Sequence, residues 1–157
     1  MRKMDTHFMQ IAIDLSIDSI ENKGGPFGAV IVKNEKIIAR ASNSVTLDND
    51  PTAHAEINAI RSACSALKTF DLSGCIMYTS CEPCPMCLGA IYWARIDKLF
   101  YANNRFNAKK IGFDDSFIYS EIKKPISKRA IPTVRIMETK AIKAFECWQQ
   151  KTNKLRY

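Results

Sequence analysis

The sequence predicts a single α/β domain of three layers, in which helices cover both faces of a mixed, mainly five-stranded sheet. Two observations indicate this class. Segments with the apolar spacing of helices alternate along the chain with short segments rich in apolar and β-branched residues. The 157 residues are about one domain's length, and 46% of them are hydrophobic, which is enough for an ordinary core. We therefore expect residues 1–157 to form one domain.

A long helix and a hairpin are expected at the start of the chain. Apolar residues recur at helical spacing over residues 5–22, and Gly24-Gly25-Pro26 ends that helix. Residues 27–32 and 36–41 are rich in apolar or β-branched side chains and are separated by Lys33-Asn34-Glu35. This arrangement predicts two antiparallel strands joined by a short turn.

Helices and strands alternate in the rest of the chain. Asp50 offers a helix N-cap and Pro51 suits the first helical position, so a helix is expected from there to about Leu67. The same reasoning predicts strands over residues 75–79, 97–102 and 131–137, and helices over residues 85–95 and 138–152. Together with the hairpin, these segments supply the five strands of the expected sheet.

The positive charge of the chain is concentrated in its C-terminal segment. Residues 1–120 contain 13 Lys or Arg and 13 Asp or Glu, whereas residues 121–157 contain 10 and 3. The net charge of +7 therefore belongs entirely to the last segment. A solvated helix face is the commonest reason for such a bias, and contact with RNA or docking of a partner subunit are the alternatives.

The sequence shows no recognisable targeting or membrane segment. His7, Asp14 and Asp18 interrupt any apolar signal-peptide core, and no apolar stretch approaches the length of a membrane span. We therefore expect a cytoplasmic protein that does not enter a membrane. Thiols are reduced in that compartment, so the six cysteines favour a metal site over disulfides.

One histidine and two cysteines have the spacing of a catalytic zinc site. Cys84 and Cys87 are three residues apart at an expected helix start, where the helix dipole favours thiolates. His54 lies near the start of the preceding helix, so two helix N-termini can meet around one ion. Three protein ligands leave one coordination position open for water, which is typical of a catalytic site. We expect one Zn²⁺ per subunit.

A carboxylate lies beside these ligands in the sequence. Glu56 is two residues after His54, which places the two side chains about 200° apart on an ideal helix. Both can reach one ion only if the ion lies beyond the N-terminal end of that helix. Glu56 would then accept a proton from water whose pKa zinc lowers to about 7.

Other metal sites fit the cysteines less well. An iron–sulfur cluster that used Cys81, Cys84 and Cys87 would need a fourth cysteine near position 91, where Ile91 stands. A structural zinc site needs four ligands, but the chain has two histidines and no second pair of closely spaced cysteines. We interpret Cys64, Cys75 and Cys147 as small apolar side chains without a metal role.

Several motifs of the chain are those of a known enzyme family. The order His-x-Glu and then Pro-Cys-x-x-Cys is the signature of zinc-dependent deaminases of bases and nucleosides. The chain resembles the cytidine deaminase-like superfamily in Phe27–Val30, His54–Glu56 and Pro83–Ala90. Within that superfamily it is similar to bacterial guanine deaminases in Asp50–Glu56, Tyr78–Pro83, Ile91–Arg95 and Gly112–Tyr119. The resemblance covers nearly the whole chain.

The resemblance implies a cytidine deaminase-like fold and the hydrolysis of guanine to xanthine and ammonia. Zinc would be bound by His54, Cys84 and Cys87, while Glu56 and Asp115 would transfer protons. The purine base would be bound by Asn43, Ala55, Phe27, Trp93 and Tyr157. Without the resemblance, Asn43 is an ordinary turn residue, Asp115 is an N-cap for the residues from Ser116 onward, and Gly28 serves strand packing as well as it serves ligand binding.

The resemblance also implies a homodimer. In it the basic segment, about residues 121–157, would be swapped between subunits, and Tyr157 would reach the partner's pocket. The alternatives are a tRNA adenosine deaminase, which the basic segment favours, and a deaminase of a related base or nucleoside such as cytosine or guanosine. A zinc-stabilised RNA-binding module without activity is also an alternative, but a purely structural site has no need of Glu56.

Overall fold

A single mixed sheet organises the fold. The computed structural model describes residues 2–156, and its four strands lie in the order β2-β1-β3-β4. The strands are β1 (Gly25–Lys33), β2 (Lys36–Asn43), β3 (Cys75–Cys81) and β4 (Lys98–Asn103). β1 is antiparallel to β2 and to β3, whereas β3 and β4 are parallel. The predicted hairpin is therefore the β1–β2 pair.

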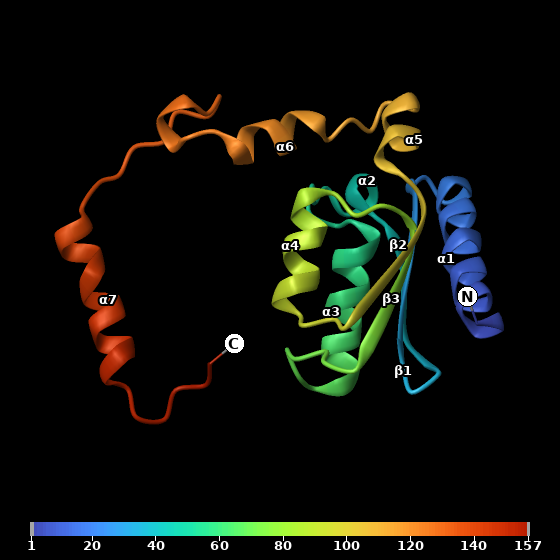
Figure 1. Ribbon diagram of the computed structural model, residues 1–157, viewed down its shortest axis with the longest axis horizontal. Helices are drawn as coiled ribbons and strands as arrows, with labels where there is room; N and C mark the ends of the chain where they lie inside the picture. The colour runs from blue at the N-terminus through green and yellow to red at the C-terminus, as the bar shows by residue number, and fades with distance from the viewer. Residues whose placement is uncertain (1, 157) are drawn as a thin grey trace. The chain divides into compact units, whose positions relative to one another are not determined.

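Helices cover both faces of the sheet, which confirms the three-layer αβα class (Figure 1). α1 (Lys3–Glu21) packs on one face, and α3 (Ala55–Leu67) and α4 (Pro85–Trp93) pack on the other. Side chains alternate accordingly: Val30 and Tyr78 join the core under α1, whereas Ile31 and Met77 join the core under α3 and α4. β1 and β3 are apolar on both faces because both faces are buried.

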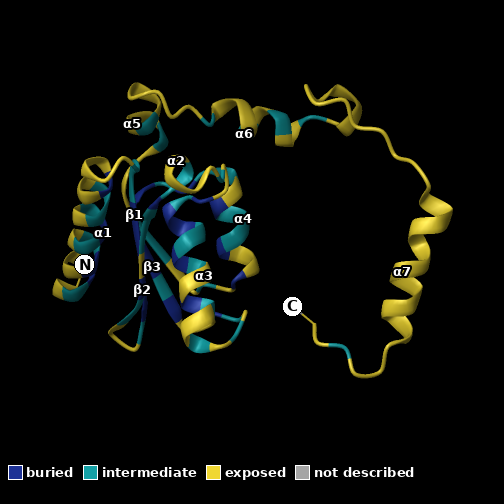
Figure 2. Ribbon diagram, turned by 180° about the vertical axis from the view of Figure 1, so that it is seen from behind, coloured by how far each residue is buried: buried dark blue, intermediate teal, exposed yellow. Residues whose placement is uncertain are grey.

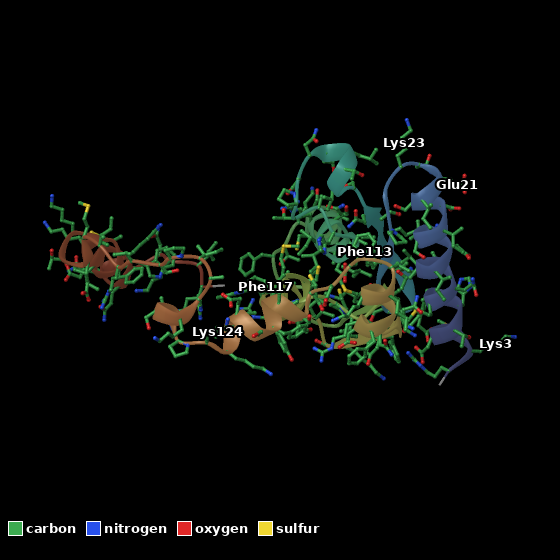
Figure 3. All side chains as sticks on the ribbon, turned by 90° about the horizontal axis from the view of Figure 1, so that it is seen from above. Lys3, Glu21, Lys23, Phe113, Phe117 and Lys124 are labelled. Carbon is green, nitrogen blue, oxygen red and sulfur yellow. The ribbon has the colours of Figure 1, made fainter. Side chains whose placement is uncertain are left out.

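A buried hydrogen bond fixes α1 against the sheet. The Tyr78 hydroxyl in β3 donates to Asp5 Oδ1 in α1 over 2.7 Å. Arg2 also donates to the Asp5 carboxylate, and the two contacts hold the pKa of Asp5 at about 2. The two ends of α1 are labelled by Lys3 and Glu21 in Figure 3.

The predicted fifth strand is wrong. Residues 131–137 have no strand pairing, so the sheet has four strands within residues 2–156. Ile131, Val134 and Ile136 are exposed, and Pro132 has no N–H to donate to a neighbouring strand. β-branched residues form a strand only where a partner strand supplies hydrogen bonds and packing, and composition alone does not report that partner.

One helix starts later than the sequence predicts. The helix expected from Pro51 begins at Ala55, because the Asp50 carboxylate accepts hydrogen bonds from the backbone N–H and the hydroxyl of Thr52 and forms a turn instead of a cap. α6 (Ser116–Lys123) begins directly after Asp115, where the N-cap alternative for Asp115 expects a helix start. Other short elements escaped prediction: α2 (Val45–Asp48), α5 (Arg105–Lys110) and the 3₁₀ turn η1 (Ile126–Lys128). They are shorter than the windows in which apolar periodicity is informative.

The chain divides into two compact units, Met1–Asp115 and Ser116–Tyr157. The second unit contains α6, η1 and α7 (Glu138–Gln150), which matches the helix predicted over residues 138–152. No described residue from 116 to 156 is buried (Figure 2). No helix within residues 2–156 is long and apolar enough to cross a membrane.

Replacement of Gly28 by alanine is expected to destabilise the packing of α1 on β1. A Cβ at residue 28 would lie 2.3 Å from Ala12 O and 2.8 Å from Leu15 Cβ, both in α1. Overpacking of this kind costs about 1–3 kcal/mol of unfolding free energy. We expect Gly28→Ala to lower the melting temperature by roughly 4 °C or more, measured by thermal circular dichroism.

Gly89→Ala is the matched control for that measurement. Among the described residues, nothing lies within 4 Å of a Cβ built at Gly89, which is inside α4. Alanine is favoured over glycine within a helix by about 1 kcal/mol, so this variant should melt at the same temperature as the wild type or higher. Equal melting temperatures for the two variants would contradict the packing role of Gly28.

Candidate active site

Three side chains converge with the spacing of a metal site. His54 Nδ1 lies 3.6 Å from Cys84 Sγ and 3.5 Å from Cys87 Sγ, and the three ligand atoms lie within 4.8 Å of one another. A tetrahedral zinc ion with ordinary Zn–S and Zn–N bonds holds its sulfur and nitrogen ligands about 3.6 Å apart. The His54, Cys84 and Cys87 side chains are therefore positioned to bind one metal ion.

Two helix N-termini bring these ligands together. His54 is the N-cap of α3 and Cys84 is the N-cap of α4, with Pro85 at the first helical position and Cys87 in the first turn. Each N-terminus carries unpaired backbone N–H groups and the positive end of a helix dipole. Both ends therefore stabilise negative charge where the thiolates must form.

Hydrogen bonds among the three ligand side chains shift their pKa values. A hydrogen bond from the Cys87 thiol, followed by the interaction with His54, lowers the pKa of Cys84 to about 4. The same hydrogen bond raises the pKa of Cys87, and the hydrogen bond with Cys84 raises the pKa of His54. A metal ion binds cysteine as the thiolate, so metal binding at this site would release the proton of the Cys87 thiol.

Glu56 lies beside the ligands in the first turn of α3. Its side chain is almost completely buried, with an exposed fraction of 6%, and burial raises its pKa. It interacts with the Cys87 thiol but is not one of the three clustered ligands. Because His54 is the N-cap of α3 and Glu56 is its second residue, both side chains lie at the N-terminal end of the helix. This fits the expected position of the metal beyond that end.

Asp115 lies in the electrostatic neighbourhood of the same site. Burial is the largest effect on the Asp115 carboxyl and raises its pKa. The negative charge of Cys84 also raises this pKa, whereas the Arg105 guanidinium lowers it. Glu82, two residues before Cys84, accepts a hydrogen bond from the backbone N–H of Arg105 over 3.0 Å. Glu82, Arg105 and Asp115, which are far apart in the sequence, therefore interact electrostatically with one another.

An aromatic contact joins the Asp115 loop to the sheet. The Phe27 and Phe113 rings are 5.0 Å apart between centroids and meet edge to face at 88°. Phe27 is half-buried in β1, and Phe113, labelled in Figure 3, precedes Asp115 by two residues. Sequence reasoning missed Phe113 as a site neighbour, although it lies inside the segment that resembles guanine deaminases.

Asn43 is the last residue of β2, and Ala55 is the first residue of α3. Asn43 ends β2 and has an exposed fraction of 7%, and its Oδ1 accepts from the backbone N–H of Val45 over 3.3 Å. Ala55 is fully buried at the first position of α3, where backbone N–H groups lack acceptors within the helix.

A further predicted base-binding residue, Trp93, lies away from the metal ligands along its helix. Trp93 is 68% exposed at the C-terminal end of α4, about 9 Å along the helix axis from Cys87. Tyr157 lies outside the described residues. Cys81 is buried, burial raises the pKa of its thiol to about 11, and it is not among the three clustered ligands.

Comparison with known proteins places these features in one family. Residues 2–103 match the cytidine and deoxycytidylate deaminase zinc-binding region. The chain is 52% identical to the guanine deaminase of Bacillus subtilis strain 168 over 151 residues, 96% of this chain and 97% of that protein. It is 46% identical to a tRNA-specific adenosine deaminase of Agrobacterium fabrum over 96 residues, 61% of this chain and 63% of that protein.

A crystal structure extends the similarity to three dimensions. The guanine deaminase structure from Bacillus subtilis superposes with a TM-score of 0.95 at 51% identity, over 100% of this chain and 99% of that one. Deaminases of this family use zinc, and the His54, Cys84 and Cys87 side chains have the geometry to hold it. The chain therefore belongs to the cytidine and deoxycytidylate deaminase zinc-binding family.

Proposed function

We propose that the protein is a zinc-dependent guanine deaminase that hydrolyses guanine to xanthine and ammonia. One observation supports this substrate over the others of the family. Similarity to the Bacillus subtilis guanine deaminase covers 96% of the chain, whereas similarity to the Agrobacterium fabrum tRNA deaminase covers 61%. The additional similarity favours guanine, because the zinc motifs themselves are common to both kinds of enzyme.

Glu56 is proposed to transfer the protons of the reaction. His54, Cys84 and Cys87 would hold the zinc ion, which would lower the pKa of water to about 7 as a Lewis acid. The Glu56 carboxylate accepts one proton from the attacking water and delivers it to a ring nitrogen, which keeps it. Glu56 then accepts the second proton from the hydroxyl group added to the carbon and delivers it to the departing amine. The water oxygen remains on the carbon as the new carbonyl oxygen of xanthine, and ammonia leaves. Burial raises the pKa of Glu56, which makes its carboxylate a stronger base toward the attacking water.

The remaining residues are proposed to hold and orient the base. Asn43 supplies a side-chain amide, and Ala55 supplies a backbone group at the start of α3. Phe27 forms an apolar wall, with Phe113 against it. Asp115 is proposed to contact guanine and assist proton transfer, which its raised pKa and its place near Cys84 support. Trp93 is also proposed to pack around the base, as the resemblance to guanine deaminases implies.

Adenosine in tRNA is the second candidate substrate. The 10 basic residues against 3 acidic ones in residues 121–157 favour contact with RNA. The same charge is compatible with docking on another subunit, so the bias does not by itself select RNA.

We further propose a cytoplasmic homodimer in which residues 121–157 cross to the partner subunit. None of the six cysteines, all within residues 2–156, forms a disulfide, which is compatible with a reducing compartment. The second unit has no buried residue among 116–156, yet it presents many large apolar side chains, which need a surface to pack on. The most exposed of them are Ile131, Val134, Ile136, Phe145 and Leu155.

Guanine is expected to be the preferred substrate in a direct comparison. Zinc-loaded protein should convert guanine to xanthine, followed by ultraviolet absorbance and by ammonia release. Cytosine, adenine, guanosine and a tRNA anticodon stem-loop containing adenosine should be turned over at least about 100-fold less efficiently, because a polar pocket rejects bases that leave its groups unpaired. Turnover of the stem-loop without turnover of guanine would reverse the assignment.

Glu56→Gln is expected to abolish turnover without removing the metal. The amide has the shape of the carboxylate but cannot accept the proton, so kcat should fall by about 10²–10⁴. Zinc content, measured by inductively coupled plasma mass spectrometry, should stay at one ion per subunit. His54→Ala is the contrasting variant and should lose zinc as well as activity. Loss of zinc from Glu56→Gln would show that Glu56 is a ligand.

A mixing experiment tests the proposed exchange of C-terminal segments. Deletion of Tyr157 should lower kcat/KM with little change in melting temperature. Dimers lacking Tyr157 are then mixed, under subunit exchange, with Glu56→Gln dimers. In a swapped dimer, one site of each mixed pair receives an intact Glu56 from one chain and an intact Tyr157 from the other. Activity should then recover to about one quarter of the wild-type value. No recovery, despite demonstrated exchange, would contradict the swap.

A further inference from the structure

The side chain of Asn58 connects two segments that carry proposed site residues. Asn58 lies in α3, one turn after His54, and its Nδ2 donates toward three acceptors. These are Ser42 O at 3.0 Å, Ser44 Oγ at 2.9 Å and Ala53 O at 3.3 Å. The first two flank Asn43, and the third directly precedes His54. One amide group therefore joins the end of β2 to the start of α3.

The acceptors determine the orientation of the Asn58 amide. Two of them are backbone carbonyls, which can only accept, so the NH₂ end must face them. The third, the Ser44 hydroxyl, directs its own proton to the Asp48 carboxylate and has lone pairs left for Asn58. An oxygen in place of Nδ2 would face two carbonyl oxygens and be repelled.

The backbone supports the same connection. Ser44 N donates to Ala53 O over 2.9 Å, and Asn58 N donates to His54 O over 2.9 Å. The Asn58 side chain thus lies between the turn after β2 and the first turn of α3. Asn43 belongs to the first of these segments, and His54 and Glu56 belong to the second.

We propose that Asn58 is a positioning residue that fixes the spacing between Asn43 and the metal centre. This rests on the proposed function, in which Asn43 binds the purine base while His54 and Glu56 serve the reaction at its amine-bearing carbon. The base spans the two groups, so productive binding requires one defined distance between them. Displacement of a substrate-binding group by about 1 Å can cost 10²-fold in rate. Asn58 is not one of the three clustered ligand residues, and in this proposal it acts through the Ser42–Ser44 turn.

Asn58→Asp is expected to raise the KM for guanine by about tenfold or more, because it removes at least two hydrogen bonds and places a carboxylate against carbonyl oxygens. Zinc content should be unchanged, and kcat should fall less than KM rises. Asn34→Asp is the matched control, because it adds the same charge on the exposed β1–β2 turn and should leave both constants unchanged.

A milder variant keeps the test decisive if Asn58→Asp does not fold. Ser44→Ala removes one of the three acceptors and leaves the two carbonyls in place. It should raise KM in the same direction by a few-fold, with zinc retained. An unchanged KM in every folded variant at these two positions would overturn the proposal.

A double-mutant cycle separates positioning from general stabilisation. Asn58→Ala and Asn43→Ala are combined, and kcat/KM for guanine is measured for each variant. If Asn58 acts through Asn43, Asn58→Ala should change kcat/KM by less than about twofold in the Asn43→Ala background. Equal effects of Asn58→Ala in both backgrounds would assign it a merely structural role.

The same measurements distinguish this proposal from the proposed function. Absence of guanine turnover by the zinc-loaded wild type would defeat the function itself. Normal wild-type turnover with additive Asn43 and Asn58 effects would defeat only the role of Asn58.

Discussion

The convergence of two helix N-termini on one set of ligands is the constraint on which the rest of the structure depends. α3 and α4 pack on the same face of the sheet, and their first residues bring His54, Cys84 and Cys87 within 4.8 Å of one another. Both helix ends carry the positive end of a dipole, so the negative charge of the thiolates stabilises their approach. The site and the packing of this layer therefore support each other.

The opposite layer makes this arrangement rigid. α1 approaches β1 so closely at Gly28 that a single added carbon would meet its backbone, and the Tyr78–Asp5 hydrogen bond fixes it to β3. β1 contains Phe27, and β3 is followed by the loop before Cys84. The two strands that pack under α1 therefore also position residues of the site. Gly28 serves this packing, one of the two roles that the sequence left open.

Local signals in the sequence were sufficient for the layers and the metal site. Cys84-Pro85 marks a helix start, and the structure places Cys84 at the N-cap of α4. The angle between His54 and Glu56 on a helix predicts a metal beyond the N-terminal end of that helix. The predicted start of the helix is wrong, because Asp50 forms a turn instead of an N-cap. The strand over residues 131–137 failed because pairing depends on a distant neighbour. Contacts such as Phe27–Phe113 and Asn58–Ser42 join residues remote in sequence, and no periodicity reports them.

In the proposed function, the zinc chemistry lies within one part of the chain, whereas the residues proposed to select guanine extend beyond that part. The zinc ligands and Glu56 lie within residues 2–103, the region matched by the deaminase family. The similarity that favours guanine extends over 96% of the chain and includes the loop with Phe113 and Asp115, which follows that region. A metal centre built on helix ends tolerates little variation, because its ligand distances are fixed by coordination. Loops packed against it through single contacts, such as one aromatic edge or one amide, can change without disturbing the ion. Such contacts are where a family with one reaction can acquire different substrates.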